Sequence, residues 1–261
     1  MLTLISLEMS LLHLASGFGH TKVVKELIDG GINVNMLSKG RLVPLCQAVS
    51  KGHTSTVELL LDSGAKMDDC GSARDYEMAS LVSQVPNVAI CRLLDERGIS
   101  NWNERTDCTF YGKFVPGFTT TPLQNMGAWR SSHVQKLTPL HHIAFQGRLE
   151  VLEYVVEHCK DVDIDTEADY GIRPLFLAII ALRNNVVRYL LKKGAKPDSI
   201  YKPTRWTMLH FAAQLGERLI VESLLEHGAG RYREISLPHS QNRFYPGEMT
   251  RLSPDFCPSK C

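Results

Sequence analysis

Along much of the chain, apolar residues recur in pairs of segments about ten residues long, with the spacing that puts them on one face of a helix. The first segment of a pair can open with Thr-Pro, as at Thr138, where the hydroxyl would cap free amides and proline suits the first turn. The second segment closes on Leu-Leu-x-x-Gly, as at Gly194, and glycine favours the left-handed conformation that ends a helix. The pattern predicts pairs of short helices.

The pairs repeat at a fixed period, which is the strongest signal in the sequence. Gly19-His20 recurs 33 residues later as Gly52-His53, and Leu175 recurs 34 residues later as Leu209. Five copies keep the same order of anchors. They open at Ser10, Val43, Thr138, Asp169 and Thr207. A sixth, degenerate copy runs from Met78 to Gly98. Because each pair is too short to bury its own apolar face, we expect the copies to stack into a solenoid.

The anchors resemble those of the ankyrin-repeat family. That family's motif is the Thr-Pro-Leu-His-x-x-Ala opening seen at Thr138, a Gly-His at mid-repeat, and the closing Leu-Leu-x-x-Gly-Ala seen at Leu190. The resemblance implies an all-α solenoid of paired antiparallel helices, with hairpin-like loops projecting between the repeats.

The chain divides into four parts by this criterion. Residues 1–100 hold two clear repeats and one degenerate repeat, and residues 137–230 hold three repeats. Between them, the segment 101–136 is an aromatic-rich insertion, which is either a decayed repeat covering its neighbours or an insertion made for binding. Residues 231–261 form an irregular, proline-containing tail. The chain could also be part of a longer array.

Composition excludes several classes of protein. The net charge is +1, whereas a dedicated nucleic-acid binder usually carries a basic excess. Seven cysteines without a CxxC pair do not suggest a secreted disulfide framework. The sequence contains no run of about 18 apolar residues without a charge, so no membrane span is expected. We expect a monomer in the cytoplasm or nucleus that binds neither nucleic acid nor membrane.

The histidines and cysteines have structural interpretations. His13, His141 and His210 share the fourth position of the opening motif, where the resemblance implies a hydrogen bond to the backbone of a neighbouring repeat. Cys46 stands at the motif's histidine position and is expected in the core. Asn35 occupies the loop position that is hydroxylated in some ankyrin proteins, and its simpler role is loop hydrogen bonding. We expect no catalytic residue, metal or cofactor.

In proteins of this family, partners bind a concave face made of loop tips and the outward side of the first helices. One loop here offers Tyr170 and Ile172 beside acidic residues, and the next offers a basic aromatic cluster in which Arg205 replaces the motif's glycine. Tyr, Trp and Arg are common interface anchors. The expected partner-binding residues are Phe145, Gln146, Tyr170, Ile172, Tyr201, Lys202, Arg205, Trp206 and Gln214.

The sequence therefore predicts a non-catalytic interaction module, or adaptor, that binds a protein or peptide on its concave face. The alternative is a small-ligand-binding regulator, or an accessory subunit of an enzyme assembly, with a pocket at the insertion. Neither reading names the partner.

Overall fold

The computed structural model describes residues 9–39, 42–66, 87–98, 102, 136–159, 162–203 and 205–230. Within these ranges the helices come in antiparallel pairs. The pairs are α1 (Leu11–Gly17) with α2 (Thr21–Asp29), α3 (Pro44–Lys51) with α4 (Thr54–Asp62), α7 (Pro139–Gln146) with α8 (Leu149–His158), α9 (Pro174–Ile180) with α10 (Asn184–Lys192), and α11 (Met208–Leu215) with α12 (Arg218–Glu226). Helix α6 (Val88–Glu96) is the second helix of the degenerate repeat.

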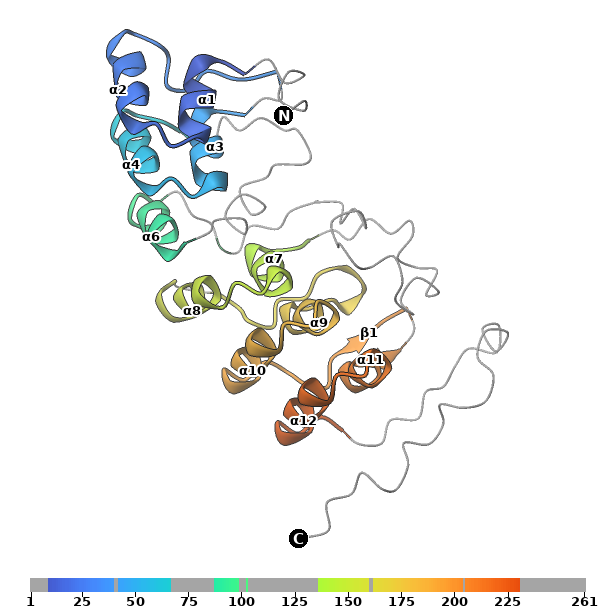
Figure 1. Ribbon diagram of the computed structural model, residues 1–261. Coiled ribbons are helices and arrows are strands. Elements are labelled where there is room, and N and C mark those ends of the chain that lie inside the picture. Colours follow the sequence, from blue (N-terminus) through green and yellow to red (C-terminus); the bar gives the residue numbers. More distant parts are fainter. Residues whose placement is uncertain are drawn as a thin grey trace.

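The helices form two rows, shown side by side in Figure 1. The second helices pack in sequence from α2 through α4, α6, α8 and α10 to α12, so this row is continuous. In the row of first helices, α1 packs on α3, and α7 packs on α9, which packs on α11. The predicted solenoid is confirmed.

Local chemistry sets where the first helices begin and end. Thr138 caps α7 through its hydroxyl while His141 accepts from the Thr138 backbone amide, and Thr207 and His210 do the same for α11. The same helices end at glycines in the left-handed conformation, Gly147 and Gly216. The expected start and stop signals are therefore used as such.

The motif's apolar anchors form the core between the two rows. Leu12, Leu45 and Leu140 at the openings of the first helices are fully buried, and so are Leu190 and Leu224 on the second helices. Cys46 is buried here as expected. It is also disulfide-bonded, which the cysteine pattern did not indicate.

Loops join one repeat to the next. The loop before α9 contains a short 3-10 turn, η3 (Asp169–Gly171), and the loop before α11 contains an antiparallel hairpin of β1 (Ile200–Tyr201) and β2 (Trp206–Thr207). In the hairpin, Ile200 pairs with Thr207 and Tyr201 pairs with Trp206. Figure 1 shows this hairpin beside α11, at the first-helix side of the solenoid.

Three predicted segments lie outside the described residues. These are residues 78–86 of the degenerate repeat, the insertion 101–136 apart from Trp102 and Lys136, and the tail 231–261. Among the described residues, no helix combines the length and apolarity needed to cross a membrane.

Candidate partner-binding surface

Histidines of the opening motif tie neighbouring repeats together. In His141, Nδ1 accepts from the Thr138 amide at 3.1 Å, so Nε2 carries the proton and donates to the Ile172 carbonyl at 3.3 Å. His13 makes the equivalent bond to the Leu42 carbonyl at 2.7 Å. Burial lowers the pKa of His13, which favours the neutral ring that this arrangement needs. The expected bond to a neighbouring repeat is therefore confirmed for His13 and His141, whereas His210 is bonded only to its capping residue Thr207 within the described part of the chain.

Loop carboxylates and amides form a second set of ties. In three loops, one side-chain oxygen accepts a hydrogen bond from a backbone amide in the next repeat's loop, at 2.7 to 3.1 Å. The pairs are Asn35 with Lys66, Asp165 with Lys196, and Asp198 with Gly230. Asn35 also donates to the Gly64 carbonyl at 3.1 Å. These bonds hold successive loop tips at a fixed separation.

An ion-pair network joins the loop before α9, which contains η3, to the loop before α11, which contains the hairpin. Glu167 accepts from Arg173 at 3.1 Å and also pairs with Lys202, and Arg173 lies 3.6 Å from Asp165. The hydrogen bond from Lys202, together with Arg173, holds the pKa of Glu167 below its usual value. The Lys202 amide also donates to the Tyr170 carbonyl at 2.9 Å. Side chains and backbone thus hold these two loops together. We call the surface formed by the loop before α9 and the loop before α11 the platform.

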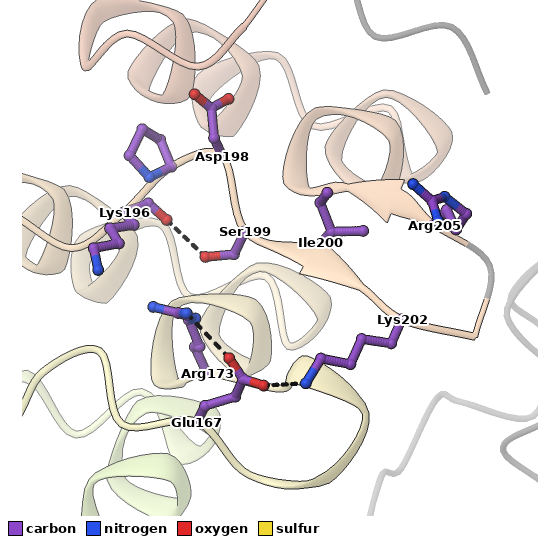
Figure 2. Close-up of a pocket in the computed structure, with 9 residues that line it drawn as sticks. Glu167, Arg173, Lys196, Asp198, Ser199, Ile200, Lys202 and Arg205 are labelled. Atoms are coloured by element: carbon purple, nitrogen blue, oxygen red, sulfur yellow. Dashed lines mark hydrogen bonds and ion pairs between the residues drawn. The ribbon is translucent and has the colours of Figure 1, made fainter. Parts of the chain in front are cut away.

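The platform surrounds an open hollow of about 600 Å³, shown in Figure 2. Its lining comes from both loops and carries four cations and two carboxylates. The lining residues are Glu167, Arg173, Lys196, Pro197, Asp198, Ser199, Ile200, Lys202 and Arg205. In Figure 2, Glu167 stands between Arg173 and Lys202 along one side, and Arg205 lies at the hairpin end.

Three side chains near the platform sit on backbone that favours glycine. Lys136, Tyr170 and Arg205 have φ of 64°, 62° and 59°. Lys136 and Arg205 each stand two residues before the residue that caps a first helix, where the loop before α9 has Gly171. Left-handed backbone costs a non-glycine residue on the order of 1 kcal/mol or more. The expected replacement of the motif's glycine by Arg205 therefore leaves the local turn in place and strains it.

The predicted contact residues separate into exposed and buried groups. Tyr170 is 39% exposed, and Lys202 and Arg205 are also exposed. Tyr201 and Trp206 are only 2% and 7% exposed, so the expectation that they form surface anchors needs correction. Ile172 is likewise buried, with its carbonyl bound to His141.

Aromatic packing explains the burial of the two hairpin rings. Tyr201 stacks on Phe176 of α9 with 5.5 Å between ring centroids, and Trp206 meets Phe211 of α11 edge-on at 5.2 Å. Such aromatic pairs stabilise the fold beyond the contribution of the apolar area that they bury. These rings fix the hairpin against two repeats, so they shape the platform from beneath.

The remaining predicted residues lie on first helices. Phe145 and Gln146 at the end of α7 and Gln214 on α11 are half-buried. The Gln146 side-chain oxygen lies 3.4 Å from the Arg148 guanidinium, whereas that of Gln214 is buried and has no hydrogen-bond partner among the described residues. None of the three lines the hollow.

The sequence analysis did not select Arg173 and Lys196, which line the hollow. Arg173 replaces the Thr of the Thr-Pro opening, and Lys196 follows the closing Gly-Ala. The sequence signal that could have identified them is a basic residue at the end of one loop, Arg173, and another at the start of the next, Lys196.

No group of three or more metal-binding side chains occurs in the described part of the chain. The pocket at the insertion that the small-ligand alternative requires falls outside the described residues.

Comparison with known proteins identifies the family. A family model described as ankyrin repeats, in three copies, matches residues 3–69 and 119–201, more than half of the chain. The chain belongs to the ankyrin-repeat family. Domains of this family are generally protein–protein interaction modules and typically not enzymes. The second match begins at residue 119, within the segment that we assigned to the insertion.

Two further proteins resemble this chain over part of their length. Human transient receptor potential cation channel subfamily A member 1 is 34% identical over 107 residues, which are 38% of this chain and 9% of that protein. Mouse RelA-associated inhibitor is 32% identical over 113 residues, 41% of this chain and 13% of that protein. The matched region thus spans only a small part of either relative.

The fold is also that of solved ankyrin domains. The crystal structure of the human ASB11 ankyrin repeat domain superposes with a TM-score of 0.67 at 24% identity, covering 87% of this chain and 88% of the other. At this identity the likeness supports the architecture of the ankyrin protein described here.

Proposed function

We propose that this ankyrin protein is a non-catalytic adaptor that binds a protein or peptide across its loop tips and first helices. One observation carries the proposal furthest. The two loops around the hollow are joined by an ion-pair network and by the bond between the Lys202 amide and the Tyr170 carbonyl. A surface ordered in advance loses little conformational entropy when a partner binds.

The exposed chemistry of the platform suits a protein partner. The two loops expose the aromatic ring of Tyr170 and the charged side chains of Lys202 and Arg205, and aromatic residues and arginine are enriched in binding hot spots. The buried rings of Tyr201 and Trp206 support this surface, so we assign them a positioning role. We further propose that the protein acts as a monomer, which size-exclusion chromatography of the purified chain would test. We also propose that it is located in the cytoplasm or nucleus, which fractionation of cells expressing a tagged chain would test.

Affinity capture with matched variants tests the function. The bait is the full chain, and the test variant combines Tyr170→Ser with Lys202→Ser. The control combines Leu219→Ser with Lys192→Ser, which removes one exposed apolar side chain and one lysine from the row of second helices. Quantitative mass spectrometry should find proteins that the wild type and the control retain and the test variant loses. If the two variants retain the same proteins, the platform is not the binding surface.

A further inference from the structure

The lining of the hollow has more cations than carboxylates, and the ion pairs within it do not neutralise all of the positive charge. Glu167 is already paired with Arg173 and Lys202, and Asp198 is held by the Gly230 amide at 2.7 Å. The side chains of Lys196 and Arg205 are exposed and have no ion-pair partner within the described residues. Two cations of the lining therefore remain available to a ligand.

Arg205 has a backbone conformation that is unfavourable for a residue with a side chain. Its φ of 59° lies in the region where glycine is favoured, while its amide donates to the Tyr201 carbonyl at 2.8 Å and closes the hairpin turn. Glycine would close the same turn without strain. A strained residue whose exposed charge has no ion-pair partner in the described part of the chain, at the rim of a hollow, points to a use for that side chain in binding.

The distribution of charge favours carboxylates over a nucleic-acid backbone. Glu167 and Asp198 stand among the cations, so a strand with a phosphate at every nucleotide would bring negative charge against both of them. The Ser199 hydroxyl donates to the Lys196 carbonyl at 2.9 Å and is not free to donate to a phosphate. Separate carboxylates on a peptide can reach the two free cations and avoid the two acids.

We propose that the hollow binds an acidic segment of a protein partner, with Lys196 and Arg205 pairing to its Asp or Glu side chains. The inference rests on the proposed function and specifies the chemistry of the partner at this site. Arginine binds a carboxylate through two parallel hydrogen bonds, so Arg205 is the stronger of the two anchors.

Peptide binding to the full chain tests the proposal. The probe is a fluorescein-labelled peptide of eight residues, alternating Glu and Gly, followed by fluorescence anisotropy at low salt. A peptide with Gln in place of Glu measures binding without charge, and a labelled oligothymidylate of twelve nucleotides tests a nucleic acid. We expect the Glu peptide to bind at least tenfold more tightly than the Gln peptide and more tightly than the oligonucleotide.

Charge-matched variants locate the binding. Lys196→Gln with Arg205→Gln should weaken binding of the Glu peptide at least tenfold. Lys22→Gln with Lys25→Gln, which removes two exposed cations from α2, should change it less than twofold. Arg205→Lys should keep more of the affinity than Arg205→Gln. Equal losses in the two double variants would show attraction to the net charge alone, and that result overturns the proposal, as does tighter binding of the oligonucleotide.

The capture experiment separates the two failures. If the platform variant loses captured proteins but the Glu and Gln peptides bind alike, the adaptor function stands and the preference for acidic segments is wrong. If no captured protein depends on the platform while Lys196 and Arg205 still select the Glu peptide, the adaptor function fails and the carboxylate site remains.

Discussion

Gly171 touches the backbone of the next loop at Ile200. A β-carbon on Gly171 would lie 2.7 Å from the Ile200 carbonyl oxygen, closer than such atoms approach in proteins, and the φ of Gly171 is +79°. The neighbouring Tyr170 carbonyl accepts from the Lys202 amide at 2.9 Å. The two loops of the platform therefore meet through backbone atoms, which only glycine at this position allows.

Gly171→Ala should destabilise the protein by about 2 kcal/mol or more, because it adds a backbone clash to a strained φ. Gly194→Ala is the matched control. Its φ is +96°, but a β-carbon there meets no atom within 4 Å, so its cost should stay near 1 kcal/mol. Urea unfolding of the three proteins measures both values. Equal costs at the two positions would mean that the loops separate easily.

Arg205→Gly should move stability and binding in opposite directions. Glycine relieves the φ of 59° and should stabilise the fold by up to about 1 kcal/mol, while the loss of the guanidinium weakens binding of the Glu peptide several-fold. Arg205→Ala loses the same charge but keeps the strain, so it should weaken binding without any gain in stability. Melting temperatures and anisotropy titrations on the same samples give both quantities.

Leu182→Gly should also stabilise the protein, by up to about 1 kcal/mol. Leu182 has φ of 58° and is 44% exposed, in the turn after the first helix where Gly52 and Gly147 stand in other repeats. Leu182→Ala removes the same apolar surface without relieving the backbone, and no stabilisation is expected from it. A melting temperature for the glycine variant at or below that of the alanine variant would contradict the strain argument.

His141→Ala should cost more stability than His210→Ala by about 1 to 2 kcal/mol. Both rings bond to their capping threonines, but His141 also bonds to the Ile172 carbonyl of the next repeat. Removing it takes away one of two donors to that buried carbonyl, which also accepts from the Ala168 amide at 2.8 Å, and breaks the tie between the two repeats. Urea unfolding monitored by circular dichroism compares the two variants, and a larger loss at His210 would show that the cap outweighs the tie between repeats.

Acid should destabilise the fold below about pH 6.5. Burial lowers the pKa of His142 to about 4 and lowers the pKa values of His13 and His210 as well. Between these values and 6.5 the unfolded chain binds protons that the folded chain does not, so stability falls as pH falls. The shift of His142 corresponds to roughly 3 kcal/mol by pH 4.

His142→Leu tests this assignment, because it removes one of the shifted groups. Unfolding free energies from pH 7 to pH 4 should fall less steeply in the variant, and His13, His210 and, towards pH 4, Glu167 should contribute to the slope that remains. A slope equal to that of the wild type would place the acid sensitivity elsewhere.

The sequence predicted the solenoid well because each of its signals is local. The caps at Thr138 and Thr207 and the glycine after each Leu-Leu pair act within a few residues, and the repeat multiplies them. The replacement of glycine by Arg205 was visible for the same reason.

The surface was predicted less well because exposure depends on residues far apart in the chain. Tyr201 and Trp206 look like surface anchors in a polar loop, and only their packing on Phe176 and Phe211 buries them. Lys196 directly follows a closing motif in the sequence, and the hollow arises where its loop meets the loop of Glu167.

The strained arginine also bears on how this protein should be engineered. A chain redesigned toward its own repeat motif would receive glycine at positions 136 and 205 and would melt at a higher temperature. It would also lack two cations at the loop tips. A consensus-stabilised version is therefore a sound reagent for structural work and a poor bait for partners.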